Sequence, residues 1–198
     1  TASLGYAPAV VNLDISDIAN PKLIGKLVFS PPFLSAGSQS IHSVLPLWDR
    51  NILFASSEAS AERCNEALNF AGLVDNRNPA RPRLMSLFPL PEPPKNKPYK
   101  NFCEKGGRFG PHNVNQEIHL PDVEKPGNLI YLTYFNAGLR VYDIKDPIQP
   151  VEKGDGVRRA LIQALERHGV PADEVDLINP HGTSTPLGDK REAEAIWT

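Results

Sequence analysis

The sequence predicts a mixed fold class, in which a repetitive all-β region and a short α/β segment meet near Lys153. Two patterns predict this organisation. Three stretches within residues 1–153 repeat one strand–turn–strand pattern, whereas residues 154–198 follow the order helix, strand, loop and helix. The composition changes at the same place, because residues 1–153 contain 17 of the 20 prolines. We therefore expect two domains, at residues 1–153 and 154–198.

Each repeat has an apolar strand ending in an aspartate, a polar turn, and a proline that opens a second strand. The aspartates are Asp14, Asp75 and Asp143, and the prolines, seven residues further on in each repeat, are Pro21, Pro82 and Pro150. An aspartate can accept a hydrogen bond from the amide two residues on, and proline fixes φ where the next strand begins. The pattern therefore predicts three β-hairpins. Their buried faces are expected at Val11, Leu13 and Ile15 in the first and at Leu139, Val141 and Ile144 in the third.

Two segments between the repeats also match each other, and each is a predicted strand carrying one histidine. They are residues 40–44 with His42 and residues 110–114 with His112, and strong strands follow at residues 51–55 and 128–132. A unit then has four strands, as in a propeller blade, and repeats at such periods are typical of blade architectures. The chain contains about two and a half such units. Because closed propellers have at least four blades, we expect open strand edges that favour self-association.

His42 and His112 are candidate metal ligands because they stand at matching positions in their units. The alternative interpretation is that each ring bonds a neighbouring backbone carbonyl. Two histidines do not complete a metal site, and the sequence shows no evident carboxylate partner for either of them. Both interpretations stay open from the sequence.

The bulk composition excludes several classes of function. A net charge of −2 gives no electrostatic basis for binding nucleic acid or an anionic membrane. The sequence also contains no run of eighteen apolar residues, the length that a membrane-spanning helix needs. Cys64 and Cys103 belong to no C-x-x-C pair, so the sequence favours neither a zinc ribbon nor a thioredoxin-type site. Whether these two cysteines form a disulfide is not decided by their positions in the sequence.

The segment GLRVYDIKDPIQPVE, together with its two partner repeats, resembles the LVIVD-repeat family of β-propellers. The resemblance covers residues 1–153. It implies that this region is part of a propeller.

The C-terminal segment lacks the strand–turn–strand pattern of the repeats and has helical spacing of apolar residues. Residues 156–168 place apolar side chains at helical spacing, with Gly169 as the residue after the helix and Pro171 as a stop. Residues 175–179 form a short apolar strand, and a second helix is expected from Asp189. The loop between them contains His181, a glycine and three hydroxyl side chains. Such a loop can bring the backbone close to a polar ligand, and its histidine can donate to a developing oxyanion.

The motif HGTSTPLGD at residues 181–189, within VDLINPHGTSTPLGDKREAEAI, resembles β-ketoacyl synthases, the thiolase-like condensing enzymes of fatty-acid and polyketide synthesis. The resemblance covers residues 154–198. It implies that His181 stabilises a thioester oxygen and that Thr183 and Thr185 bind the phosphopantetheine arm of the substrate. It also implies acyl carrier protein as a partner, no required cofactor and a cytoplasmic location, although export is an alternative for the repeat region.

The same family also needs a cysteine nucleophile, a second histidine and a lysine, and no residues of this chain match them. Cys64 and Cys103 lack the small-residue surroundings of that nucleophile. We therefore expect a β-ketoacyl synthase-like fragment fused to partial propeller repeats, a chimera that is not catalytically competent by itself. The alternative is a non-enzymatic propeller that binds a ligand or a metal and carries an incidental tail.

Overall fold

A computed structural model describes residues 2–6, 9–29, 41–67, 69–114, 127–155, 164–166, 168–171 and 175. The chain divides into two compact units, Thr1–Gly154 and Asp155–Thr198. In the part of the chain that is described, the strands form three small antiparallel sheets, helices are few, and no barrel closes. The propeller therefore stays a prediction.

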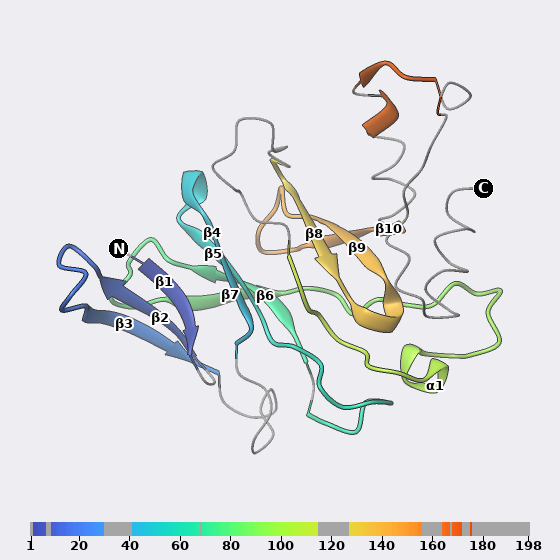
Figure 1. Ribbon diagram of the computed structural model, residues 1–198, viewed down its shortest axis with the longest axis horizontal. Helices are drawn as coiled ribbons and strands as arrows, with labels where there is room; N and C mark the ends of the chain where they lie inside the picture. The colour runs from blue at the N-terminus through green and yellow to red at the C-terminus, as the bar shows by residue number, and fades with distance from the viewer. Residues whose placement is uncertain are drawn as a thin grey trace. The chain divides into compact units, whose positions relative to one another are not determined.

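The three sheets follow one another along the chain and are coloured blue, cyan to green, and yellow to orange in Figure 1. The first has the order β1-β2-β3, formed by Ala2–Tyr6, Ala9–Asp14 and Lys22–Val28. The second has the order β4-β5-β6-β7, formed by Ser43–Leu47, Ile52–Ser56, Ala71–Asp75 and Arg83–Leu87. The third has the order β10-β9-β8, formed by Val151–Asp155, Leu139–Asp143 and Leu129–Thr133. Short helices occur at Trp48–Arg50 (η1), Phe102–Lys105 (α1) and Phe135–Ala137 (η2).

The two histidines lie outside the strands in which the sequence placed them. β4 begins one residue after His42, and the segment around His112 reduces to an isolated bridge between Val114 and Leu132. The His112 amide and the Thr133 amide still form main-chain hydrogen bonds across this bridge, whereas Pro111 has no amide hydrogen with which to extend the ladder. Pro46 is accommodated within β4 because β4 is an edge strand.

The turns of the three hairpins confirm the role predicted for the repeat aspartates. In each turn the side-chain oxygen accepts a hydrogen bond from the amide two residues on. The amides are those of Ser16, Arg77 and Lys145, which donate to Asp14, Asp75 and Asp143 at 2.9, 3.0 and 2.8 Å. A second such bond follows three residues later in every repeat, from Ala19 to Asp17, from Ala80 to Asn78 and from Ile148 to Asp146. Two successive side-chain-closed turns therefore define each hairpin.

The buried face predicted for the first hairpin is wrong. Val10 and Asn12 are fully buried, whereas Ile15 is exposed and Val11 and Leu13 are only half-buried. Asn12 turns inward because its side-chain amide donates to Asn76 Oδ1 at 2.7 Å and to the Pro79 carbonyl at 2.9 Å. The third hairpin agrees better with its prediction, because Val141 and Ile144 are buried and Leu139 is half-buried.

The turn of each later repeat contacts the sheet that precedes it. The Pro79 carbonyl, in the turn after β6, lies so close to Gly25 of β3 that a Cβ atom there would approach its oxygen to 2.4 Å. The Pro147 carbonyl, in the turn after β9, accepts a hydrogen bond of 2.7 Å from Ser86 Oγ of β7. Pro79 and Pro147 stand four residues after their repeat aspartates, and Gly25 and Ser86 stand eleven residues after theirs. The same contact therefore recurs between successive sheets.

The central strands of the second sheet, β5 and β6, are buried on both faces. Ile52 and Phe54 of β5 join a cluster with the third sheet and α1, whereas Leu53 and Ala55 join a cluster with the first sheet. All five residues of β5 are buried. The alternation of side chains along one strand thus supplies two cores.

Cys64 and Cys103 form a disulfide, with their Cα atoms 5.5 Å apart. The bond joins the loop after β5 to α1, across 39 residues of sequence. Among the residues described, no helix has both the length and the apolar character needed to cross a bilayer.

In the second unit, residues 164–166 and 168 are helical, as predicted for the end of the first tail helix. Gly169 has a φ of 62°, and its amide donates to the Glu166 carbonyl at 3.3 Å, while the Val170 amide donates to Leu165 at 3.0 Å. This hydrogen-bond pair is a Schellman motif, so the predicted role of Gly169 is confirmed.

Replacing both cysteines by serine should lower the free energy of unfolding by about 4 kcal/mol, because a cross-link closing 39 residues restricts the unfolded chain. Denaturant titration of the parent and of the Cys64→Ser/Cys103→Ser variant measures the difference. A reductant should shift the parent midpoint toward that of the variant and leave the variant unchanged. A parent that is insensitive to full reduction would contradict this expectation.

Asp75→Asn should flatten the acid limb of the stability profile. The Arg77 guanidinium, followed by the Arg77 amide, lowers the pKa of Asp75 from 3.8 to about 2. Its contribution is therefore complete above pH 3.8 and is lost as the pH falls toward 2. Asparagine retains the oxygen that closes the turn but has no charge to titrate. Melting temperatures measured across this pH range should fall less steeply in the variant, whereas the exposed Asp49→Asn serves as the control.

Candidate functional site

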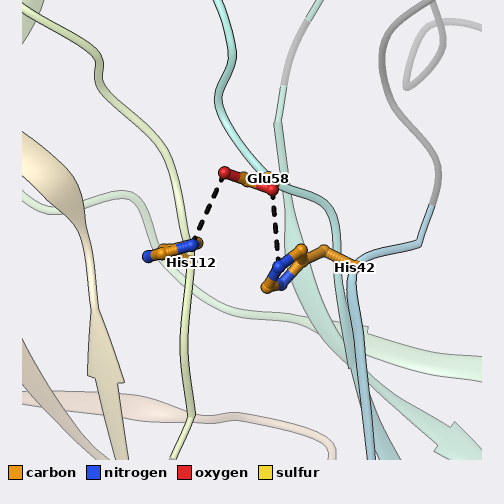
Figure 2. Close-up of side chains that lie close together, drawn as sticks. All are labelled: His42, Glu58 and His112. Carbon is orange, nitrogen blue, oxygen red and sulfur yellow. Dashed lines mark ion pairs between the residues drawn. The ribbon is translucent and has the colours of Figure 1, made fainter.

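The side chains of His42, Glu58 and His112 meet where three separate segments approach one another (Figure 2). His42 precedes β4, Glu58 follows β5, and His112 lies shortly before the bridge at Val114. The Nε2 atom of His42 is 3.4 Å from Glu58 Oε2, and the Nε2 atom of His112 is 3.5 Å from Glu58 Oε1. One carboxylate thus lies between two imidazole rings.

Equivalent main-chain hydrogen bonds hold the two histidines in place. The His42 amide donates to the Ser56 carbonyl at 2.8 Å, and the His112 amide donates to the Thr133 carbonyl at 2.9 Å. Ser56 and Thr133 are the last residues of β5 and β8. The two histidines therefore occupy equivalent places in adjacent sheets, as their matching sequence positions predicted.

Glu58 follows the end of β5 by two residues, and the corresponding position after β8 is Phe135. The ring of Phe135 stacks on His112, with centroids 4.8 Å apart and planes 23° apart. The Arg108 guanidinium lies over the Phe135 ring, 4.0 Å from its centroid. The Nη1 atom of Arg108 is also 3.6 Å from Glu58 Oε1. One repeat thus supplies the carboxylate and the next supplies an aromatic support.

A serine hydroxyl orients His42. Ser43 Oγ is 2.9 Å from His42 Nδ1 and donates to the His112 carbonyl at 3.3 Å. Because the single hydroxyl proton is directed at that carbonyl, the hydroxyl oxygen accepts a hydrogen bond from the Nδ1–H group of His42. In the neutral ring this leaves the lone pair of His42 on Nε2, the atom that faces Glu58.

Burial lowers the pKa of His112, and the nearby His42 and Arg108 also lower it, while the Glu58 charge opposes them. About a third of each side chain in this cluster is exposed (32% for His42, Glu58 and His112). The cluster therefore combines an imidazole at His112 whose protonated form is disfavoured with access from solvent.

The structure brings together both predicted metal-ligand candidates and adds Glu58, which the sequence analysis missed. The alternative interpretation was that each ring bonds a backbone carbonyl. The Nε2 atoms of both rings instead face the Glu58 carboxylate. The available signal was the place of Glu58 just beyond the strand that pairs with the histidine segment. The other predicted site residues, His181, Thr183 and Thr185, lie outside the described residues.

The C-terminal part of the chain is similar to known proteins. Residues 135–198 match the family model of the β-ketoacyl synthase C-terminal domain. The mitochondrial 3-oxoacyl-[acyl-carrier-protein] synthase of Arabidopsis thaliana is 46% identical over 50 residues, which is 25% of this chain and 11% of that protein. The 3-oxoacyl-[acyl-carrier-protein] synthase 2 of Staphylococcus aureus is 43% identical over 47 residues, 24% of this chain and 12% of that protein.

The chain therefore spans about a tenth of the length of these curated relatives, and the similarity supports a β-ketoacyl synthase-like fragment. No solved structure matches the chain. The comparisons give no support to the LVIVD-repeat resemblance of residues 1–153, which stays a prediction.

Proposed function

We propose that residues 154–198 supply the acyl-thioester-binding loop of a β-ketoacyl synthase-like protein. The observation that carries the proposal is the agreement between the motif at residues 181–189 and the similarity of this segment to 3-oxoacyl-[acyl-carrier-protein] synthases. An acyl carrier protein, or another carrier of a phosphopantetheine thioester, is the partner that this proposal implies.

Each residue of the loop has a role that suits its chemistry. The imidazole of His181 would donate a hydrogen bond to the thioester oxygen, on which negative charge develops when malonyl thioester loses carbon dioxide. The hydroxyls of Thr183 and Thr185 would bond the amide groups of the phosphopantetheine arm. Gly182 would let the backbone come close to the arm because it has no Cβ.

The disulfide separates thioester binding from covalent catalysis. Acyl transfer to a cysteine needs a free thiolate, and the two cysteines of this chain are bonded to each other. Neither Cys64 nor Cys103 can therefore accept an acyl group in the oxidised protein. We propose binding of the thioester by this chain, without condensation at a cysteine of its own.

The repeat region belongs to a different architecture in this proposal. The four-stranded order β4-β5-β6-β7 and the recurring turns support the idea that residues 1–153 are part of a propeller joined near Lys153 to the synthase-like segment. A ligand or metal function of the repeats would then be independent of the loop at His181.

Titration with acetyl-coenzyme A, which carries the phosphopantetheine arm, tests the proposal by calorimetry on the whole chain. Saturable binding is expected below about 1 mM, the range of typical enzyme substrates. Thr183→Val should weaken it by about 2- to 12-fold, the equivalent of one hydrogen bond of 0.5–1.5 kcal/mol. His181→Ala should weaken it at least as much.

His168→Ala is the matched control, because His168 is exposed and lies outside the motif. Coenzyme A without the acetyl group reports the contribution of the arm alone. Absence of saturable binding at millimolar ligand, or equal binding by the parent and both loop variants, would overturn the proposal.

A further inference from the structure

We propose that His42 Nε2, the Glu58 carboxylate and His112 Nε2 bind a single divalent transition-metal ion. This site lies in the repeat region and is independent of the thioester-binding function proposed for the tail. The site adds a carboxylate to the two histidine candidates, which gives three ligands with two imidazole nitrogens and carboxylate oxygen.

The spacing of the donor atoms fits one ion. Ligands about 2.0–2.2 Å from a tetrahedral Zn²⁺ ion lie roughly 3.4 Å from each other. The Nε2 atom of His42 lies 3.4 Å from Glu58 Oε2, and the Nε2 atom of His112 lies 3.5 Å from Glu58 Oε1, the other oxygen of the same carboxylate. Each of the three residues offers a ligand atom within 4.8 Å of the other two.

The hydrogen bonds around His42 direct its metal-binding nitrogen into the cluster. Nδ1 is engaged with Ser43 Oγ at 2.9 Å, so the Nε2 lone pair of the neutral ring points at the Glu58 carboxylate. Two acceptors that face each other are stabilised by a cation between them. Ligating histidines commonly place their other ring nitrogen on a hydrogen-bond partner in this way.

The main chain and the aromatic neighbour hold the ligands where a metal site needs them. The main-chain amides of His42 and His112 donate hydrogen bonds to the carbonyls of the last residues of β5 and β8, and the His112 ring stacks on Phe135. These contacts restrict the positions of both histidine ligands in the absence of an ion.

The donor set selects the class of metal. Two imidazole nitrogens and one carboxylate suit Zn²⁺, Fe²⁺, Co²⁺ or Ni²⁺, whereas Mg²⁺ and Ca²⁺ prefer oxygen ligands. With three protein ligands and side chains that are 32% exposed, coordination positions are left for water or a substrate. This arrangement is typical of catalytic sites and differs from closed structural ones.

Arg108 is the competing cation. Its Nη1 atom lies 3.6 Å from Glu58 Oε1, so its guanidinium would oppose an approaching metal ion and share the carboxylate with it. Arg108→Gln should therefore bind the ion more tightly than the parent, whereas a cluster held together only by ion pairs would bind no metal in either protein.

The test is calorimetric titration of the metal-stripped whole chain with Zn²⁺ at neutral pH, with Mg²⁺ as the comparison ion. One equivalent of Zn²⁺ should bind and Mg²⁺ should not. Zn²⁺ binding should weaken at least 100-fold in each of the ligand variants His42→Gln, Glu58→Gln and His112→Gln. Ser43→Ala should weaken Zn²⁺ binding by about 10-fold, because the Ser43 hydroxyl orients the His42 ring. His168→Gln, at an exposed histidine of the tail, should bind as the parent does.

Thermal unfolding with and without Zn²⁺ separates lost ligation from lost folding. Zn²⁺ should raise the melting temperature of the parent and of His168→Gln, and it should leave folded Glu58→Gln unchanged. Binding that survives in all three ligand variants, or no binding by the parent, would overturn the proposal. Either result would leave the thioester-binding proposal unaffected, because that function is read out with acetyl-coenzyme A.

Discussion

Burial of both faces of β5 and β6, the central strands of the second sheet, is the constraint on which the rest of the repeat region depends. Side chains of β5 alternate between two cores, with Phe54 in one and Leu53 in the other. Each fully buried side chain of this size contributes about 1.5–3 kcal/mol. Because the first and third sheets pack on opposite faces of this one, its packing also fixes the distance between the end of β5 and the end of β8. The cluster of His42, Glu58 and His112 is a product of that packing.

Local chemistry could be predicted from the sequence, and long-range pairing could not. The turn role of Asp14, Asp75 and Asp143 depends on an amide two residues away, and the Gly169 cap depends on one turn of helix. Both were predictable for that reason. The inward face of β2 was not, because Asn12 is buried by partners in the next repeat, 64 and 67 residues away. The disulfide likewise joins segments 39 residues apart.

The candidate metal site shows the same division. The matching positions of His42 and His112 came from the repeat, and their equivalent amide bonds confirm that equivalence. Glu58 has no counterpart in the next unit, where Phe135 stands at its position, so the repeat pattern could not single it out. Its place beside both rings follows only from how the strands pair. For the tail, the motif at His181 carried a family resemblance that the comparisons support, without any contribution from packing.

The recurring contact between a turn and the preceding sheet couples neighbouring repeats in series. The Pro79 carbonyl binds Asn12 and crowds Gly25, and the Pro147 carbonyl binds Ser86. Opening one hairpin turn therefore removes a partner from the sheet before it, in the manner of nearest-neighbour coupling in repeat proteins. Amide hydrogen exchange in β3 should then report on the integrity of the turn after β6, and exchange in β7 on the turn after β9. Local unfolding would pass backwards along the chain, from each repeat to the one synthesised before it.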